Sequence, residues 1–319
     1  MTENMTSLSK EYWVLAYYYF TPIENPEDEV RKHKTFFEER DVSGRIYISH
    51  QGINGQMSAL KEDAYAYMHW MHDDARFKDM EFKVHKHHEN AFPKMTVKVR
   101  KQLVAMDKDV DLSKRGQPLS AKEWESMLDN RDEDLVLIDT RNNYETRIGY
   151  FEGALLPPLE TFREFPQFAK ELKKTRDPKK TKVLMYCTGG IRCELYSALM
   201  MEEGFESVYQ LQGGVIKYGL EVGHKHWVGK LFVFDDRLAI SVGNEDGSEI
   251  IGSCRHCKSL SDTYYNCANM DCNELFLCCL TCLHTHKGCC QESCVHSERL
   301  RPYHAEDTHK PFRKKHLYK

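Results

Sequence analysis

The chain has 319 residues, of which 41% are hydrophobic, enough for two domains with cores of their own and an appendage. Its formal net charge of −4 excludes a globally basic nucleic-acid binder, so any RNA site has to be a local patch. No apolar run approaches the length that spans a bilayer, and residues 1–10 show no signal peptide and predict a loose tail. We expect a cytoplasmic protein with no membrane partner. There, 12 cysteines favour metal binding and catalytic sulfur over disulfides.

Residues 1–106 predict a domain in which strands and helices alternate. The aromatic run Tyr12–Phe20 is typical of a strand, and amphipathic helical patterns follow it. In chain order the predicted elements are a strand, a helix, two strands, a helix and a strand, at 12–20, 27–40, 45–49, 53–59, 61–74 and 81–85. This βαββαβ order predicts a ferredoxin-like fold. In the second helix, Tyr65, Met68 and Met71 are expected to face inward.

A basic segment follows this series of elements. Lys98 and Arg100 alternate with valines and share one face of a predicted strand, and Lys94 precedes them. With Phe92 nearby, such a face suits RNA phosphates, although a solvated edge strand explains the same residues. The turn at 50–55 also has two interpretations. It is either an ordinary turn or a surface of exposed backbone groups that faces a substrate.

Residues 107–118 are charged and poor in apolar side chains, which predicts a linker. After it, Ser120 and Glu123 have the spacing of a capping box that opens a helix through Leu128. Short apolar runs then alternate with helical patterns, which predicts a parallel α/β layer with its ligand site at the carboxyl edge of the strands. The predicted strands are 135–139, 155–156, 183–186 and 208–210.

The strongest chemical signal follows the third of these strands. An apolar run leads into a loop that begins at Cys187 and ends at Arg192, and a helix follows to Glu203 and stops at Gly204. Backbone N–H groups of a glycine-bearing loop and the helix dipole both favour a thiolate, and Arg192 adds a permanent positive charge. We predict that Cys187 is a nucleophile and Arg192 its catalytic partner. The loop residues between them are Thr188, Gly189, Gly190 and Ile191.

Further residues are candidates for the surroundings of this loop. Arg141 and Glu145 are candidates for lining the pocket, and Asp139 is expected to cap or hydrogen-bond a nearby loop. Cys193 either resolves an oxidised Cys187 or packs within the helix. Neighbouring helical positions point about 100° apart, which favours packing.

The C-terminal part, residues 229–319, predicts a hairpin at 230–243, a cysteine-rich segment and a basic tail at 310–319. The tail suits either RNA contact or a soluble terminus. Ten of the 12 cysteines fall between Cys254 and Cys294, and a segment this poor in large apolar residues is typical of a structural zinc site. The first four cysteines form one predicted set and later ones a second, with adjacent cysteines leaving ligand choices open. The predicted ligands are Cys254, Cys257, Cys267, Cys272, Cys278, Cys282, Cys290 and Cys294.

Several separated pieces of the chain together resemble the rhodanese domain. They are 135–141, with its strand ending in Asp-x-Arg, 144–154, 187–192 and the Gly-Gly turn in 211–218. The resemblance covers about residues 119–228. The loop is one residue shorter than the Cys-x5-Arg phosphatase loop, and its smaller ring suits a cysteine persulfide better than a phosphate.

With its flanks at 50–55 and 92–100 and its cysteine-rich tail, the whole chain resembles the rhodanese-domain tRNA uridine hydroxylase family. The resemblance implies an oxidoreductase that hydroxylates the wobble uridine to 5-hydroxyuridine. The tRNA anticodon stem-loop is then the partner and molecular oxygen the co-substrate. The sequence carries no flavin, haem or nicotinamide signature. A rhodanese-type sulfurtransferase and a non-catalytic binding module stay open as alternatives.

One mechanism suits this implied reaction. The thiolate or persulfide of Cys187 adds to uracil C6, which makes C5 nucleophilic toward oxygen, while Arg192 and the loop N–H groups stabilise the charge. An anticodon loop presents its base unstacked, as this chemistry needs.

Overall fold

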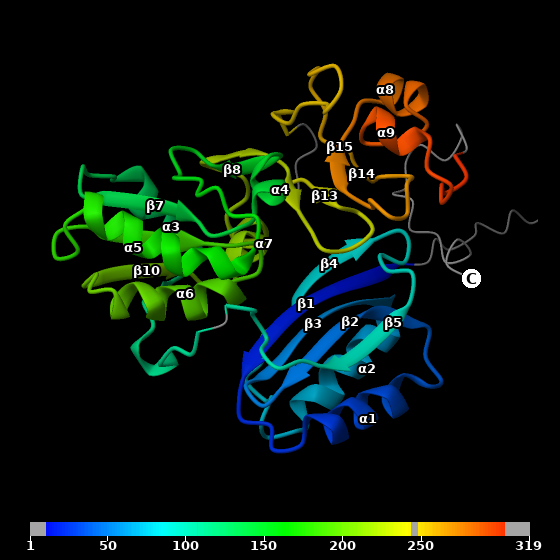
Figure 1. The fold of residues 1–319 in the computed structure, drawn as a ribbon. Coiled ribbons are helices and arrows are strands. Elements are labelled where there is room, and N and C mark those ends of the chain that lie inside the picture. Colours follow the sequence, from blue (N-terminus) through cyan, green and yellow to red (C-terminus); the bar gives the residue numbers. More distant parts are fainter. Residues whose placement is uncertain (1–10, 107, 244–247, 304–319) are drawn as a thin grey trace, which may run out of the picture. The chain divides into compact units, whose positions relative to one another are not determined.

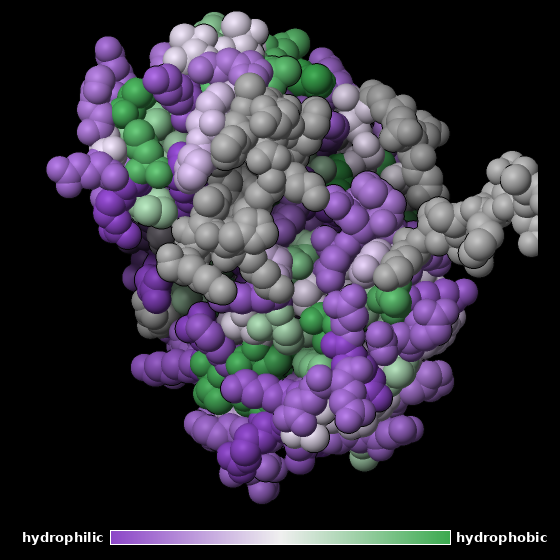
Figure 2. All heavy atoms as spheres, turned by 90° about the vertical axis from the view of Figure 1, so that its right-hand side faces the viewer, coloured by the Kyte–Doolittle hydropathy of each residue, from purple (hydrophilic) through white to green (hydrophobic). Residues whose placement is uncertain are grey.

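The computed structural model describes residues 11–106, 108–243 and 248–303, so the predicted tails at 1–10 and 310–319 lie outside the described residues. The chain divides into two compact units, Met1–Leu103 and Val104–Lys319 (Figure 1). Among the described residues, no helix is both long and apolar enough to cross a membrane. Hydrophilic side chains dominate the face seen in Figure 2, where hydrophobic ones form separate groups.

The first unit is a five-stranded sheet with two helices (Figure 1). Its strands are β1 (Tyr12–Phe20), β2 (Val42–Ser49), β3 (Gly52–Leu60), β4 (Lys83–His87) and β5 (Met95–Val99), and its helices are α1 (Pro26–Phe37) and α2 (Lys61–His72). The strand order β4-β1-β3-β2 is that of the predicted ferredoxin-like fold, which is confirmed. β5 adds a parallel edge strand beside β2.

Both helices pack on one face of this sheet. Alternate residues of β1, such as Leu15 and Tyr17, join the core there with side chains from α1 and α2. The prediction that Tyr65 faces inward is wrong, because the buried stripe of α2 runs through Tyr67 and Met71. Tyr65 is 44% exposed at the margin of that stripe.

The second unit begins with a parallel four-stranded sheet in the order β6-β10-β9-β7. Its strands are β6 (Gln117–Leu119), β7 (Leu135–Asp139), β9 (Lys182–Tyr186) and β10 (Ser207–Leu211). β6 takes up the last residues of the segment that the sequence assigns to a linker. The predicted strand at 155–156 is reduced to one bridge between Ile138 and Leu155. The helices are α3 (Ala121–Asp129), α4 (Asn143–Thr146), α5 (Phe165–Thr175), α6 (Ile191–Glu202) and α7 (Gly214–Glu221), with short 3-10 turns η1 (Leu112–Lys114) and η2 (Phe162–Glu164).

The described part of this unit also contains three small antiparallel pairs of strands. They are β8 (Gly149–Phe151) with β11 (Trp227–Gly229), β12 (Leu231–Phe232) with β13 (Ala239–Ile240), and β14 (Tyr264–Asn266) with β15 (Leu275–Leu277). The β12–β13 pair confirms the predicted hairpin. The cysteine-rich segment adds α8 (Leu280–Thr285) and α9 (Glu292–Val295). An apolar cluster that includes Ile148, Phe232 and Tyr264 packs this segment against the parallel-sheet part of the unit.

Candidate active site and metal centres

The loop from Cys187 to Arg192 joins β9 to α6 at the carboxyl edge of the parallel sheet. Gly190 caps α6 with a φ of 100°, a conformation that favours glycine. This turn aims the Gly190 N–H at the Cys187 sulfur, with an N···Sγ distance of 3.1 Å. The Cys187 side chain is fully buried. The strand, loop and helix therefore hold the sulfur in the arrangement that the sequence predicts.

The start of α7 holds the loop from its other side. The N–H groups of Val215 and Ile216 donate to the carbonyl oxygens of Cys187 and Thr188, at 3.0 and 3.1 Å. These first-turn N–H groups have no partner within their own helix. A Cβ at Gly214 would lie 2.6 Å from the Cys187 and Thr188 oxygens, so this position requires glycine. The sequence places Gly214 only in the Gly-Gly turn of the rhodanese resemblance, without indicating its closeness to the loop.

The surroundings of Cys187 favour its thiolate. Burial raises the pKa of this thiol, but hydrogen bonding from Cys193, the charge of Arg192 and nearby backbone N–H groups outweigh burial and lower the pKa to about 5. Burial and the neighbouring Cys187 raise the pKa of Cys193 well above its ordinary value. Cys193 therefore keeps its proton and faces Cys187, with Thr140 Oγ1 3.6 Å from its sulfur.

Glu145 and Arg192 form a buried ion pair beside the loop. The two terminal nitrogens of Arg192 donate to the two carboxylate oxygens of Glu145, at 2.6 and 2.8 Å. The Thr188 hydroxyl donates to the same carboxylate at 3.0 Å. Burial raises the pKa of Glu145, but the Arg192 charge and hydrogen bonds outweigh it, so the net shift is downward. Glu145 thus lies at the loop, and Arg192 acts on Cys187 through its field.

Arg141 is buried in the core of the domain, close enough to Glu145 for its charge to help lower the pKa of that carboxyl. Its guanidinium donates to Asp139 at 2.9 and 2.6 Å and to the Gly149 carbonyl oxygen at 2.6 Å. It lies 5.0 Å from the centre of the Trp227 ring and is fully buried. Arg141 therefore links the end of β7 to the start of β8, with Asp139 as its ion-pair partner.

The three cationic RNA-binding candidates lie in the first unit. Lys94 precedes β5, Lys98 lies within it and Arg100 follows it, and all three are exposed. The Arg100 guanidinium stacks 4.7 Å from the centre of the Tyr47 ring. An aromatic ring of β2 therefore accompanies the basic strand face, a neighbour that sequence spacing could not reveal.

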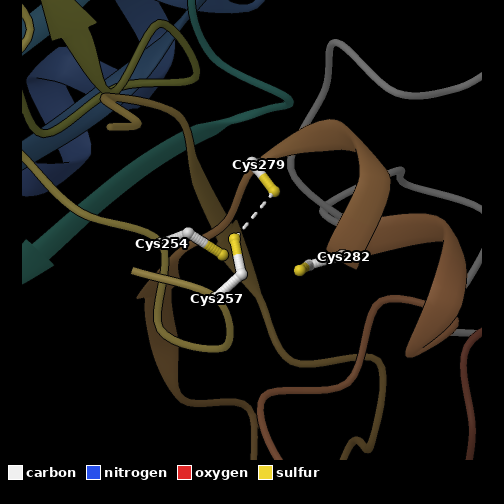
Figure 3. A group of neighbouring side chains, drawn as sticks. All are labelled: Cys254, Cys257, Cys279 and Cys282. Carbon is white, nitrogen blue, oxygen red and sulfur yellow. Dashed lines mark hydrogen bonds between the residues drawn. The ribbon is translucent and has the colours of Figure 1, made fainter. Parts of the chain in front are cut away.

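The cysteine-rich segment brings eight thiols into two groups, in which all sulfurs of a group lie within 4.8 Å of one another. The sulfurs of Cys254, Cys257, Cys279 and Cys282 point toward a common centre (Figure 3). The prediction that the first four cysteines form one set is wrong. The structure groups the first pair of cysteines along the chain with the third pair, and the second pair with the fourth. One group is Cys254, Cys257, Cys279 and Cys282, and the other is Cys267, Cys272, Cys290 and Cys294.

The predicted ligand Cys278 lies in neither group; its neighbour Cys279 takes that place. Consecutive residues at the end of a strand point to opposite sides, so only one of the two can face the cluster. The Cys278 thiol is buried and donates to a backbone oxygen instead. The signal for the correct grouping is the equal spacing of Cys254 with Cys257 and of Cys279 with Cys282.

The geometry of both groups fits zinc. Four thiolates about 2.3 Å from a tetrahedral zinc lie about 3.8 Å apart. The Cys257 and Cys279 sulfurs are 3.6 Å apart, and so are the sulfurs of Cys272 and Cys290. Four thiolates also complete the coordination shell of zinc. Each group can therefore hold a structural metal ion with no open position.

The parallel sheet and the cysteine loop at its edge define a rhodanese-like domain. Residues 120–220 match the rhodanese-like domain family, 228–295 the rhodanase C-terminal family, and 12–103 the UPF0176 acylphosphatase like domain family.

Three relatives resemble the chain over nearly its whole length, and each is named tRNA uridine(34) hydroxylase. The protein from Protochlamydia amoebophila is 56% identical over 96% of this chain and 95% of its own. Those from Chlamydia trachomatis serovar D and Chlamydia felis are 54% and 53% identical over 97% of this chain, and over 94% and 95% of their own lengths. The chain belongs to the tRNA uridine(34) hydroxylase family.

Proposed function

We propose that this protein hydroxylates uridine 34, the wobble base of the tRNA anticodon, to 5-hydroxyuridine. Molecular oxygen is the co-substrate and the anticodon stem-loop the partner, which places the protein in the cytoplasm. The observation that carries the proposal is identity of 52–56% to relatives of that name over at least 94% of their length. In this scheme the first unit contacts tRNA and the second carries the chemistry.

Cys187 is the residue proposed to attack the base. Its pKa of about 5 makes it a thiolate at neutral pH, ready to form a bond to uracil C6 either directly or through a bound persulfide sulfur. The electron pair then moves toward O4, and the enolate makes C5 reactive toward oxygen. One oxygen atom stays on C5 and the other leaves as water, which takes two electrons from a reductant and two protons from solvent. Cys187 then leaves C6 as a thiolate while C5 loses its proton, which restores the double bond of the ring.

The neighbours of Cys187 have separate roles in this proposal. The N–H of Gly190 stabilises the sulfur anion, to which it already donates. Arg192 supplies positive charge, and Glu145 fixes its position through two hydrogen bonds. Arg141 remains a proposed neighbour of the pocket, with its buried guanidinium donating to Asp139 and to the Gly149 carbonyl oxygen.

We further propose that both four-cysteine groups hold structural zinc. The cysteine-rich segment has a small core made largely of the cysteines themselves, so metal ions are its main source of stability. With four thiolates per ion, each zinc lacks a position for water, and its role is to hold the fold.

Nucleoside mass spectrometry of tRNA tests the function. Cells that lack the gene should lose 5-hydroxyuridine at position 34, the wild-type gene should restore it, and the Cys187→Ser variant should fail to do so while folding normally. Thiolated uridine in place of the hydroxylated base would support the sulfurtransferase alternative. Unchanged tRNA in all strains would contradict both hydroxylation and thiolation of the tRNA. The mass of the Cys187 peptide shows whether an extra sulfur is attached.

A further inference from the structure

The sheet of the first unit has a second face that neither of its helices covers. Residues directly opposite each other on neighbouring strands share a face, so the register identifies its members. Tyr18 of β1 is opposite Asn54 of β3, which is opposite Tyr47 of β2. Tyr47 is in turn opposite Lys98 of β5. None of these four residues belongs to the core beneath the helices.

The chemical character of this face is uniform. It carries aromatic rings, cations and amides, and the register places no aspartate or glutamate of the five strands on it. We call it the platform, which consists of Tyr18, Phe20, Arg45, Tyr47, Asn54, Gln56, Lys83, Lys98 and Arg100. Its aromatic rings are partly exposed.

The rings and cations of the platform lie against each other. Arg100 stacks 4.7 Å from the Tyr47 ring centre, and the Lys83 ammonium lies 4.9 Å from the Tyr18 ring centre. The rings of Tyr18 and Phe20 meet edge to face with centres 6.1 Å apart. Such contacts fix the orientation of the rings, which reduces the entropy lost when a flat ligand stacks on them.

The other end of the same face is closed. Val14, Ala91 and Phe92 form a small buried cluster there, and the Ala91 N–H donates to Ser58 Oγ at 3.2 Å. The loop before β5 therefore covers the start of β1. The platform is confined to the half of the face that carries Tyr18, Phe20 and Tyr47.

We propose that the platform binds the unpaired bases of the anticodon loop by stacking on Tyr18, Phe20 and Tyr47. Arg45, Lys98 and Arg100 then neutralise the adjacent phosphates. Asn54 and Gln56 offer both donors and acceptors to base edges. Aromatic rings on an open sheet are a known way to hold single-stranded RNA, whereas a duplex hides the flat faces of its bases. This proposal rests on the proposed function, since it names how the same substrate is held.

The test measures binding of an anticodon stem-loop RNA to Cys187→Ser protein, which binds without turnover. Replacing Tyr18 or Tyr47 by leucine keeps an apolar side chain but removes the ring, and should weaken binding about tenfold. The dependence of affinity on salt should stay as it is, because no charge changes. The control is Tyr65→Leu, which removes a tyrosine that is 44% exposed on the helical side of the unit.

A second measurement needs no substitution in the platform. A stem-loop that carries 5-bromouridine in its loop should photocrosslink to peptides of β1 and β2, whereas a fully paired hairpin stem should not. Crosslinks confined to other segments, or leucine variants that bind like the Tyr65 control, would overturn the platform.

The two proposals fail in different ways. If Cys187→Ser abolishes 5-hydroxyuridine but the tyrosine variants bind normally, only the platform is wrong. If the tyrosine variants lose the stem-loop but wild-type protein makes no 5-hydroxyuridine, the platform stands and the proposed reaction is wrong.

Discussion

Arg192 and Glu145 are paired through two parallel hydrogen bonds although 47 positions separate them in the chain. The pair is buried, so the guanidinium beside the reactive cysteine is held at one orientation. Removing one partner of such a buried ion pair strongly destabilises the folded protein.

Glu145→Gln is therefore expected to lower the free energy of unfolding by about 3 kcal/mol, because it removes the carboxylate that pairs with the buried Arg192 guanidinium. Urea denaturation measures the change. Glu171→Gln is the control, since it removes an exposed partner of Lys174 and should cost under about 1 kcal/mol. Equal losses in the two variants would show that the buried pair contributes no more than a surface pair.

The pKa of about 5 gives Cys187 a distinctive pH profile. A thiol whose pKa is lowered on folding stabilises the folded protein above the unfolded pKa of the thiol, and that stabilisation is lost as the pH falls through about 5.

The alkylation rate of Cys187, followed on its peptide by mass spectrometry, should be constant from about pH 6 upward. An ordinary thiol would instead react faster up to its pKa of about 8.5. A rate that keeps rising through pH 8 would contradict the assignment.

Gly214→Ala should disturb the cysteine loop directly. The added Cβ would lie 2.6 Å from two loop oxygens, so either the loop or the start of α7 has to move. We expect 5-hydroxyuridine formation to fall at least tenfold, with the alkylation profile of Cys187 shifted toward higher pH. Gly204→Ala is the matched control, because Gly204 also has a positive φ but no atom of the described residues lies within 4 Å of the new Cβ. Its variant should keep activity and lose only stability.

Adjacent cysteines allow a sharp test of the metal centres. Elemental analysis should find about two zinc ions per chain in wild-type protein. Cys279→Ser removes one predicted ligand and should cost at least one zinc, whereas Cys278→Ser changes a buried thiol outside both groups and should keep both. Equal zinc content in the two variants would contradict the ligand assignment.

The basic strand face makes a separate prediction about salt. Replacing Lys94, Lys98 and Arg100 by alanine should weaken tRNA binding and reduce the slope of log affinity against log salt by about 0.7 to 0.9 for each phosphate that the protein no longer neutralises. The control replaces three exposed cations on the opposite side of the unit, Arg31, Lys32 and Lys34. An unchanged slope in the first variant would favour the alternative interpretation, in which these residues form the solvated face of an edge strand.

The sequence predicts the cysteine loop well because its parts are contiguous. A strand, a loop and a helix within a few dozen residues determine where Cys187 points, and the capping box at Ser120 is equally local. The ferredoxin-like order follows from the succession of short amphipathic patterns. The prediction for Tyr65 fails because this residue lies at the margin of the buried stripe, where a small difference in helical phase decides exposure.

Partners that are distant in sequence are harder to predict. Nothing local indicates that Glu145 binds Arg192, which is 47 positions away, whereas Arg141 and its partner Asp139 are only two positions apart. Cysteine grouping has the same difficulty, because many combinations satisfy the same spacing and only the path of the chain selects one.

The two cysteine groups alternate along the chain, so metal binding by one group is expected to depend on metal binding by the other. A metal ion held by the first group would close a loop from Cys254 to Cys282, which contains Cys267 and Cys272 of the second group. An ion held by the second group would close a loop from Cys267 to Cys294, which contains Cys279 and Cys282 of the first. Releasing either ion frees chain that positions the other, so the ions should leave together. Chelation should then proceed as one cooperative transition, with no stable state that holds a single zinc.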